Sequence, residues 1–191
     1  PVMLKSVYGG GGRGIRIVNT DQELQDAYET VTAESIAAVG KSAILVEKFL
    51  EQTRHIEYQF ARDKHGNAVH IFERECSIQR RNQKLIEQTP SPIVDEETRE
   101  RIGKLVVNAA NAVDYTNLGT AEFLRADNGK FYFIEINARL QVEHPITEFV
   151  SGLDLVKLQL DIANGEPIPF KQSDLKMNGY AIECRINAED T

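Results

Sequence analysis

Apolar positions recur along this chain with two periodicities, one typical of strands and one typical of helices. Apolar runs over residues 2–7, 15–18 and 44–50 predict three strands near the start. Between the second and third, apolar residues recur at helical spacing, which predicts a helix that begins after Thr20 and ends near Gly40. This first group predicts a small lobe that ends near Leu50.

The rest of the chain repeats the mixture of strands and helices. Runs 55–62 and 68–77 flank a polar turn and predict a hairpin, and runs 120–125 and 130–138 predict a second one. Asp95 opens a predicted helix whose apolar positions are Ile102, Leu105, Val106 and Ala109.

Two further elements follow the second hairpin. Residues 153–163 predict another helix, and residues 180–187 a last strand without a visible partner. Hairpins mixed with helices favour the α+β class, with two lobes.

Each strand of the second hairpin carries a carboxylate among apolar residues. If Asn128 and Gly129 form a two-residue turn, counting back from it places Glu122 directly opposite Glu135. Two like charges roughly 5 Å apart repel by about 3 kcal/mol at an effective dielectric of about 20, so a cation is expected between them.

Strand alternation adds polar residues to the face of Glu135. Asn137 and Arg139 share that face, so it offers oxygen ligands for a hard cation such as Mg²⁺, with a cationic side chain beside them. The alternative is an exposed sheet face on which a bulge separates Glu122 from Glu135. The opposite face is predicted to be core, and its residues are Tyr132, Ile134, Ile136 and Ala138.

Composition and charge narrow the class of protein. The 191 residues suffice for one large domain or two small ones, and a net charge of -7 argues against a nucleic-acid or anionic-membrane surface. No apolar run approaches the roughly 18 residues of a membrane span. We expect Cys76 and Cys184 to be free, buried thiols in the cytoplasm, or in the mitochondrial matrix of a eukaryote.

Five glycines occupy six positions at 9–14, between the first two predicted strands. The segment contains G-x-G-x-x-G, yet a strand follows it rather than a helix, and no Gly-Lys-Ser/Thr closes it. It is therefore either a hairpin tip or a loop whose backbone N–H groups bind phosphate. Lys5, a cation within the preceding apolar strand, favours the phosphate interpretation.

Two polar segments provide candidate chemistry. One leaves the strand at 68–77 and is either a solvated surface or an oxyanion site; its residues are Arg74, Glu75, Gln79, Arg80, Arg81 and Lys84. In the other, Glu143 lies near Arg139 and is a candidate general base. His144 is a more familiar base, but a lone histidine before Pro145 is more often structural.

These segments together resemble the ATP-grasp region of biotin carboxylase, the component that carboxylates biotin in acetyl-CoA, propionyl-CoA and pyruvate carboxylases. The matching strings are residues 1–5 with 9–14, 47–50, 54–57, 76–84, 135–145 and 183–190. The resemblance implies an ATP-grasp fold with two lobes and a glycine-rich lid, truncated at both ends. It divides the chain into a lid lobe (1–50), a core lobe (51–170) and the start of a carboxy-terminal domain (171–191).

The resemblance also implies a reaction and its residues. ATP and bicarbonate would give carboxyphosphate and ADP, and the carboxyl group would pass to biotin. The nucleotide would contact Lys5, Gly11, Gly12, Glu47, Lys48, Phe49, Leu50, His55, Gln79 and Asn82. Glu122, Glu135 and Asn137 would hold two Mg²⁺ or Mn²⁺ ions. Lys84, Arg139 and the Val142 backbone would hold bicarbonate, Glu143 would deprotonate it, and Arg185 would stabilise the biotin enolate.

Two departures and two alternatives accompany this interpretation. Asn82 stands where many members have histidine, and Tyr8 where some have a small residue. The resemblance implies a biotin carboxyl carrier and a carboxyltransferase as partners, and a homodimer. The alternatives are another ATP-grasp ligase, such as a carbamoyl-phosphate synthetase, and a nucleotide-binding module without turnover.

Overall fold

The computed structural model describes residues 1–8 and 14–188, which form two compact units. The small unit comprises Pro1–Gln52 with Gln79–Gln83, and the large unit comprises Thr53–Ile78 with Lys84–Thr191. The lobe boundaries at residues 50 and 170 stay a prediction.

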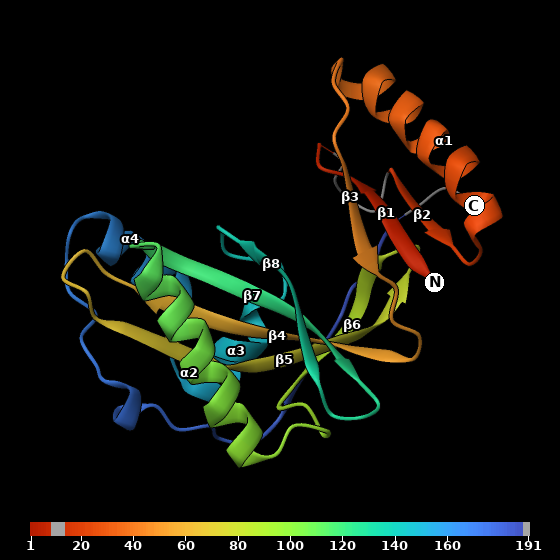
Figure 1. The fold of residues 1–191 in the computed structure, drawn as a ribbon. Helices are drawn as coiled ribbons and strands as arrows, with labels where there is room; N and C mark the ends of the chain where they lie inside the picture. The colour runs from red at the N-terminus through yellow and green to blue at the C-terminus, as the bar shows by residue number, and fades with distance from the viewer. Residues whose placement is uncertain (9–13, 189–191) are drawn as a thin grey trace. The chain divides into compact units, whose positions relative to one another are not determined.

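The small unit is a three-stranded antiparallel sheet, in the order β2-β1-β3, with one helix packed on it. Its elements are β1 (Val2–Ser6), β2 (Ile15–Val18), α1 (Asp21–Val39) and β3 (Ile44–Lys48), as predicted (Figure 1). Leu4, Val18 and Val31 form its buried core. Gly40 ends α1 in the left-handed conformation, with φ 71°, and its N–H donates to the Ile36 carbonyl.

The large unit is built on a six-stranded sheet in the order β8-β7-β4-β5-β6-β9. The pairs β4–β5, β4–β7, β7–β8 and β6–β9 are antiparallel. Its elements are β4 (Thr53–Arg62), β5 (Ala68–Arg80), β6 (Gln83–Thr89), α2 (Glu96–Ala112), β7 (Asn117–Ala126), β8 (Phe131–Asn137), α3 (His144–Ser151), α4 (Leu155–Ala163), the 3-10 turn η1 (Gln172–Asp174) and β9 (Ala181–Cys184) (Figure 1).

Helices cover both faces of this sheet. Ile56, Tyr58 and Phe60 of β4 pack against α2 in one buried cluster. Ala61 of β4 belongs to a second cluster with residues of α3 and α4. Because side chains alternate along a strand, Glu57 and Ala61 lie on the face opposite to α2. This alternation brings buried charge to the face that carries the candidate site.

Asp63, at the end of β4, joins two distant parts of the chain. Its fully buried carboxylate accepts hydrogen bonds from the Asn67 side chain at 2.7 Å and from the Ile168 backbone N–H at 2.8 Å. It also accepts the backbone N–H groups of His65 and Asn67, within the turn between β4 and β5. These bonds hold the pKa of Asp63 below its usual value, although burial opposes them.

Sequence reasoning missed one strand, one helix, the short 3-10 turn η1 and one strand pairing. β6 and α3 were not predicted, and the last strand, β9, does have a partner, because it pairs with β6. Leu105 and Ala109 of α2 are exposed; its buried apolar side chains are four residues apart, at Ile102, Val106 and Ala110.

The register of β7 and β8 confirms the predicted carboxylate pair, although the predicted turn is wrong. The Ala126 N–H donates to the Lys130 carbonyl, so three residues form the loop instead of two. A bulge then leaves Ile134 without a partner position, and Glu122 lies opposite Glu135. On the other face, Tyr132, Ile134 and Ile136 are half-buried, but Ala138 is exposed, because β8 ends at Asn137.

Candidate active site

A row of four charged residues crosses the sheet of the large unit. Glu135 of β8 lies opposite Glu122 of β7, Glu122 lies opposite Glu57 of β4, and Glu57 lies opposite Arg74 of β5. Like charges placed opposite each other on adjacent strands destabilise a sheet unless cations compensate them. Compensation here comes from Arg74 and from Lys84.

Lys84, the second residue of β6, places its ammonium among three carboxylates. Nζ lies 2.9 Å from Glu122 Oε1 and 2.7 Å from Glu143 Oε1, and it also pairs with Glu57 Oε2. Lys84 therefore compensates Glu122 of the predicted pair, together with Glu57 and Glu143, but among the described residues it forms no ion pair with Glu135.

The surroundings keep these groups charged. Burial alone would raise the pKa of Glu57, but Arg74 and Lys84 outweigh burial and hold it below its usual value. Burial also acts to raise the pKa of Glu122, yet the His55 hydrogen bond and Lys84 lower it to about 2. Burial acts to lower the pKa of Lys84, but Glu57 and the other carboxylates raise it above its usual value. At neutral pH Glu57, Glu122 and Lys84 are all ionised.

Arg74 is structural rather than part of a solvated or anion-binding run. Its side chain is fully buried, and its guanidinium bonds Glu57 Oε1 at 2.6 Å. The remaining donors go to Gln59, Thr147, Gln141 and Thr120 at 2.9–3.4 Å. Arg74 therefore ties the row to α3 and to the segment before α3.

Arg185, just after β9, links Glu143 to one further buried carboxylate, Glu87. Its Nη2 donates to Glu143 Oε2 at 2.7 Å, and its Nε lies 2.8 Å from Glu87 Oε1. Glu143 therefore contacts both Lys84 and Arg185. Three of the predicted catalytic residues, Lys84, Glu143 and Arg185, thus meet in one cluster.

Glu122 gathers further predicted ligands. His55 Nε2 lies 2.8 Å from Glu122 Oε2, and Asn137 Nδ2 donates to Glu122 Oε1 at 2.9 Å. Glu135 stands beside them in the row and is exposed. Carboxylate and amide oxygens are ligands of the kind that Mg²⁺ takes, but here Asn137 turns its amide nitrogen toward Glu122, so a magnesium site of Glu122, Glu135 and Asn137 stays a prediction.

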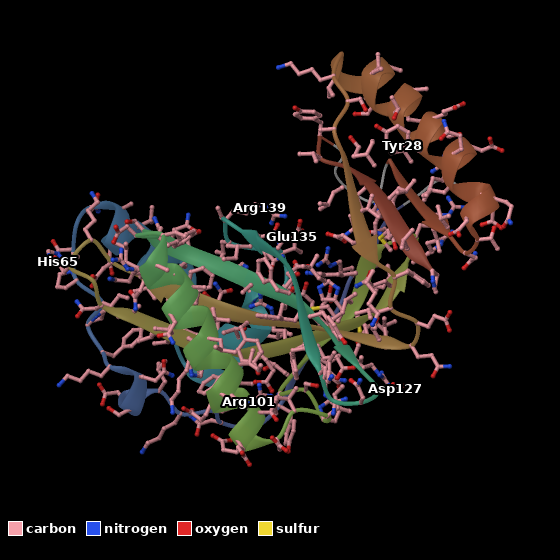
Figure 2. All side chains as sticks on the ribbon, viewed as in Figure 1. Tyr28, His65, Arg101, Asp127, Glu135 and Arg139 are labelled. Atoms are coloured by element: carbon pink, nitrogen blue, oxygen red, sulfur yellow. The ribbon has the colours of Figure 1, made fainter. Side chains whose placement is uncertain are left out.

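Arg139 and Val142 lie near the end of β8 without joining the Lys84 cluster in the described residues. Figure 2 shows Arg139 beside Glu135 at this end of β8. Arg139 donates to the Leu140 carbonyl at 3.4 Å and lines a cavity of about 470 Å³ together with Asn117 and Gln159. Val142 is exposed in the turn before α3.

Within the small unit, Lys5 of β1 and Glu47 of β3 form an ion pair at 2.5 Å. Lys48 is exposed, while Phe49, Leu50 and Gln79 are half-buried. Gly11 and Gly12 lie outside the described residues. Their proposed contacts with a nucleotide stay a prediction.

Asn82 has a clear structural role at the turn between β5 and β6. Arg81 and Asn82 have φ of 53° and 62°, the values of the two central residues in a type I′ turn. Asparagine adopts this left-handed conformation at low cost, and so does histidine, which explains why the turn accepts asparagine here.

The two cysteines are free, as predicted, but they differ in burial. Cys76 is buried, whereas Cys184 on the edge strand β9 is exposed, so the prediction of two buried thiols is wrong for Cys184. Burial, reinforced by the charge of Glu57, raises the pKa of Cys76 well above its usual value. His144 holds the turn before α3, since its Nδ1 lies 2.8 Å from the Gln141 carbonyl.

Three residues of this cluster were not among the candidate residues: Glu57, Glu87 and Gln141. Arg74 was considered only as part of a solvated or oxyanion-binding segment. Glu57 carried only a weak signal, because β4 also contains Thr53, Arg54, His55, Gln59 and Arg62 among its apolar residues. Glu87 carried none, because β6 itself was not predicted.

Along the described residues, no helix is both long enough and apolar enough to span a membrane.

Comparison with known proteins identifies the family. The family model described as "Carbamoyl-phosphate synthase L chain, ATP binding domain" matches residues 1–171. The chain belongs to this family. The matched residues include the whole row of Glu135, Glu122, Glu57 and Arg74.

Two curated relatives of this chain are carboxylases. The chain is 52% identical over 190 residues to the 2-oxoglutarate carboxylase small subunit of Hydrogenobacter thermophilus, and 50% identical over 190 residues to a biotin carboxylase of Nostoc. All of this chain is covered in both comparisons, but only 40% and 42% of the relatives. The chain therefore spans about two fifths of their length.

A solved structure shows the same fold. The biotin carboxylase domain dimer of the Hydrogenobacter thermophilus 2-oxoglutarate carboxylase, in complex with MgADP, ADP and bicarbonate, matches with a TM-score of 0.96 and 52% identity. The match covers 100% of this chain and 42% of that chain. The predicted α+β, ATP-grasp fold and the resemblance to biotin carboxylase are confirmed.

Proposed function

We propose that this ATP-binding domain is part of a biotin carboxylase, which uses ATP and bicarbonate to carboxylate biotin on a carrier protein. The observation that carries the proposal is the cluster in which Lys84 binds Glu57, Glu122 and Glu143 while Arg185 binds Glu143. It gathers a candidate base and two candidate anion-binding cations around a carboxylate row suited to Mg²⁺.

Glu143 acts as the base toward bicarbonate. When a bicarbonate oxygen attacks the terminal phosphorus of ATP, the bond from that phosphorus to ADP breaks and the bicarbonate proton passes to Glu143. Lys84 and Arg139 neutralise the anion. Glu143 forms ion pairs with Lys84 and Arg185, so it is fixed in position before bicarbonate binds.

Biotin then receives the carboxyl group. The carbon–oxygen bond of carboxyphosphate breaks, phosphate leaves with the proton of the ureido nitrogen, and that nitrogen bonds the carboxyl carbon. Arg185 stabilises the negative charge that develops on the ureido oxygen of biotin. Its guanidinium is a donor of fixed geometry and lies beside the base.

The nucleotide and its metal ions use the remaining predicted residues. Glu122, Glu135 and Asn137 hold Mg²⁺ or Mn²⁺, which neutralises phosphate charge when bound. Lys5 and the backbone of Gly11 and Gly12 bind phosphate oxygens. Residues at the adenine are Glu47, Lys48, Phe49 and Leu50, and other nucleotide contacts come from His55, Gln79 and Asn82.

ADP release by the protein that carries this sequence tests the proposal. We expect release to require Mg²⁺ and bicarbonate and to increase with free biotin. Glu135→Gln should lower it on the order of 10²-fold, because a charged ligand is lost. Glu97→Gln, at an exposed position of α2, is the matched control. ADP release that is independent of bicarbonate, or undiminished in Glu135→Gln, would contradict the proposal.

A second candidate is a carbamoyl-phosphate synthetase, which the description of the matching family favours. Such an enzyme also activates bicarbonate with ATP but passes the carboxyl group to ammonia. Stimulation of ADP release by ammonia and not by biotin would support this candidate.

The expected partners follow from the proposed reaction. They are a biotin carboxyl carrier, a carboxyltransferase and a second copy of the chain; the matching Hydrogenobacter thermophilus structure is a dimer. The expected location is the cytoplasm, or the mitochondrial matrix in a eukaryote. Size-exclusion chromatography with light scattering tests the dimer.

A further inference from the structure

The pairing of β6 with β9 brings two carboxylates together. Glu87 of β6 lies directly opposite Glu183 of β9, a like-charge pair that destabilises a sheet by itself. Arg185 is two residues beyond Glu183 and therefore on the same side of β9. The Arg185 backbone N–H also donates to the Leu85 carbonyl at 2.9 Å, which fixes Arg185 beside β6.

Glu87 depends on Arg185 for compensation. Its carboxylate is fully buried, and within the described residues neither of its oxygens accepts a hydrogen bond. Among those same residues, Arg185 is the one cation at ion-pair distance, with Nε 2.8 Å from Oε1. Burial raises the pKa of Glu87, and Arg185 opposes this effect. A buried carboxylate with so little compensation costs stability, and an apolar side chain would cost less.

The guanidinium of Arg185 is held at two points. Its Nε lies at ion-pair distance from Glu87 Oε1, without a hydrogen bond among the described residues, and its Nη2 donates to Glu143 at 2.7 Å. Because the guanidinium is planar and rigid, fixing Nε determines where the other donors point. Without Glu87, Arg185 keeps Glu143 as a partner but can rotate about it.

We propose that Glu87 is a positioning residue, which orients the Arg185 guanidinium so that it can contact biotin beside Glu143. The inference rests on the proposed function, in which Arg185 stabilises charge on biotin and takes no part in the cleavage of ATP. Loss of Glu87 should therefore affect biotin carboxylation far more than bicarbonate-dependent ATP cleavage.

The test compares two activities of the complete protein in the Glu87→Gln variant, which keeps the side-chain size but removes the charge. We expect kcat for carboxylation of free biotin to fall about ten- to hundredfold, as for a misplaced catalytic group. ADP release with bicarbonate and without biotin should change less than twofold. Glu87→Asp, which retains the charge, should recover part of the loss. The matched control is Glu166→Gln, at an exposed position after α4.

A double-variant cycle distinguishes positioning from general loosening. In an Arg185→Lys background, Glu87→Gln should add almost nothing to the loss, because the group that it positions is already gone. Equal loss of both activities, or a full additional loss in the Arg185→Lys background, would overturn the proposal.

Failure of the proposed function gives a different result. In that case the unaltered protein carboxylates no biotin. The positioning of Arg185 is then judged by nuclear magnetic resonance relaxation of its Nε–H group. Glu87→Gln should increase the motion of this group if Glu87 holds it, and unchanged motion would overturn the inference.

Discussion

Gly103 of α2 lies directly against the ring of His70 on β5. A Cβ atom at Gly103 would stand 2.5 Å from Cδ2 and Nε2 of that ring, closer than carbon atoms tolerate. Gly103 therefore allows the helix to approach the sheet at this point.

We expect Gly103→Ala to lower the free energy of unfolding by about 1–3 kcal/mol, the usual cost of overpacking. Helix propensity alone would favour alanine by roughly 0.8–1 kcal/mol, so a net loss means that the steric overlap dominates. Denaturant unfolding provides the measurement. His70→Ala makes room for the new methyl group, so the double variant should be more stable than the sum of the two losses predicts. Strict additivity would refute the contact.

His70 should make stability depend on pH. The ring is buried, and burial lowers its pKa below the usual value of about 6.5. Within the described residues neither ring nitrogen has a hydrogen-bond partner, and the charges nearest the ring belong to Glu73, Arg99, Glu100 and Lys104.

The sign of the effect follows from proton binding. Below about pH 6.5 the unfolded chain binds a proton at His70, while the folded protein resists protonation. The free energy of unfolding therefore falls by up to about 1.4 kcal/mol for each unit by which the pH is lowered. Comparing unfolding at pH 7.5 and 5.5 measures this loss. His70→Leu should flatten the slope in that window, and an unchanged slope would assign it to other groups.

Lys84 should matter greatly for stability, because its removal leaves three carboxylates facing one another. We expect Lys84→Met to lower the free energy of unfolding by about 3–5 kcal/mol at neutral pH, the cost of breaking a buried charge cluster. Lys64→Met is the matched control at an exposed position, and it should change stability by no more than about 0.5 kcal/mol. Similar small effects at both positions would show that water already compensates Glu57 and Glu143.

Arg74→Lys tests whether the shape of the guanidinium is needed as well as its charge. Lysine cannot serve the five acceptors that Arg74 contacts, so at least one buried polar group is left unpaired. We expect a loss of about 2 kcal/mol or more in chemical denaturation. Arg101→Lys, on the exposed side of α2 (Figure 2), should change stability by less than about 0.5 kcal/mol.

Strand and helix periodicity predicted most elements, but it could not reveal β6 or α3. β6 mixes charged and apolar residues because it carries Lys84 and Glu87 into the cluster, so its pattern does not look like a strand. The α3 segment has only eight residues, too few for a helical period to stand out, and it has Pro145 in its first turn, where proline is tolerated.

The carboxylate pair was predicted correctly for a reason that is only partly right. A three-residue loop shifts the register of β7 and β8 by one position, and the bulge at Ile134 shifts it back. A turn signal in sequence does not contain either detail. Glu57 was missing from the candidates because its role depends on pairing with β7, which is distant in sequence.

The bonds of Asp63 set a limit on how far the chain can be shortened from its C-terminal side. A cut before Ile168 would remove a backbone donor from a buried carboxylate and weaken the β4–β5 turn. A cut between Ile168 and β9 would spare that carboxylate but remove Arg185, the ion-pair partner of Glu87. The shortest piece that folds and the shortest piece that retains the cluster around Glu143 therefore have different ends.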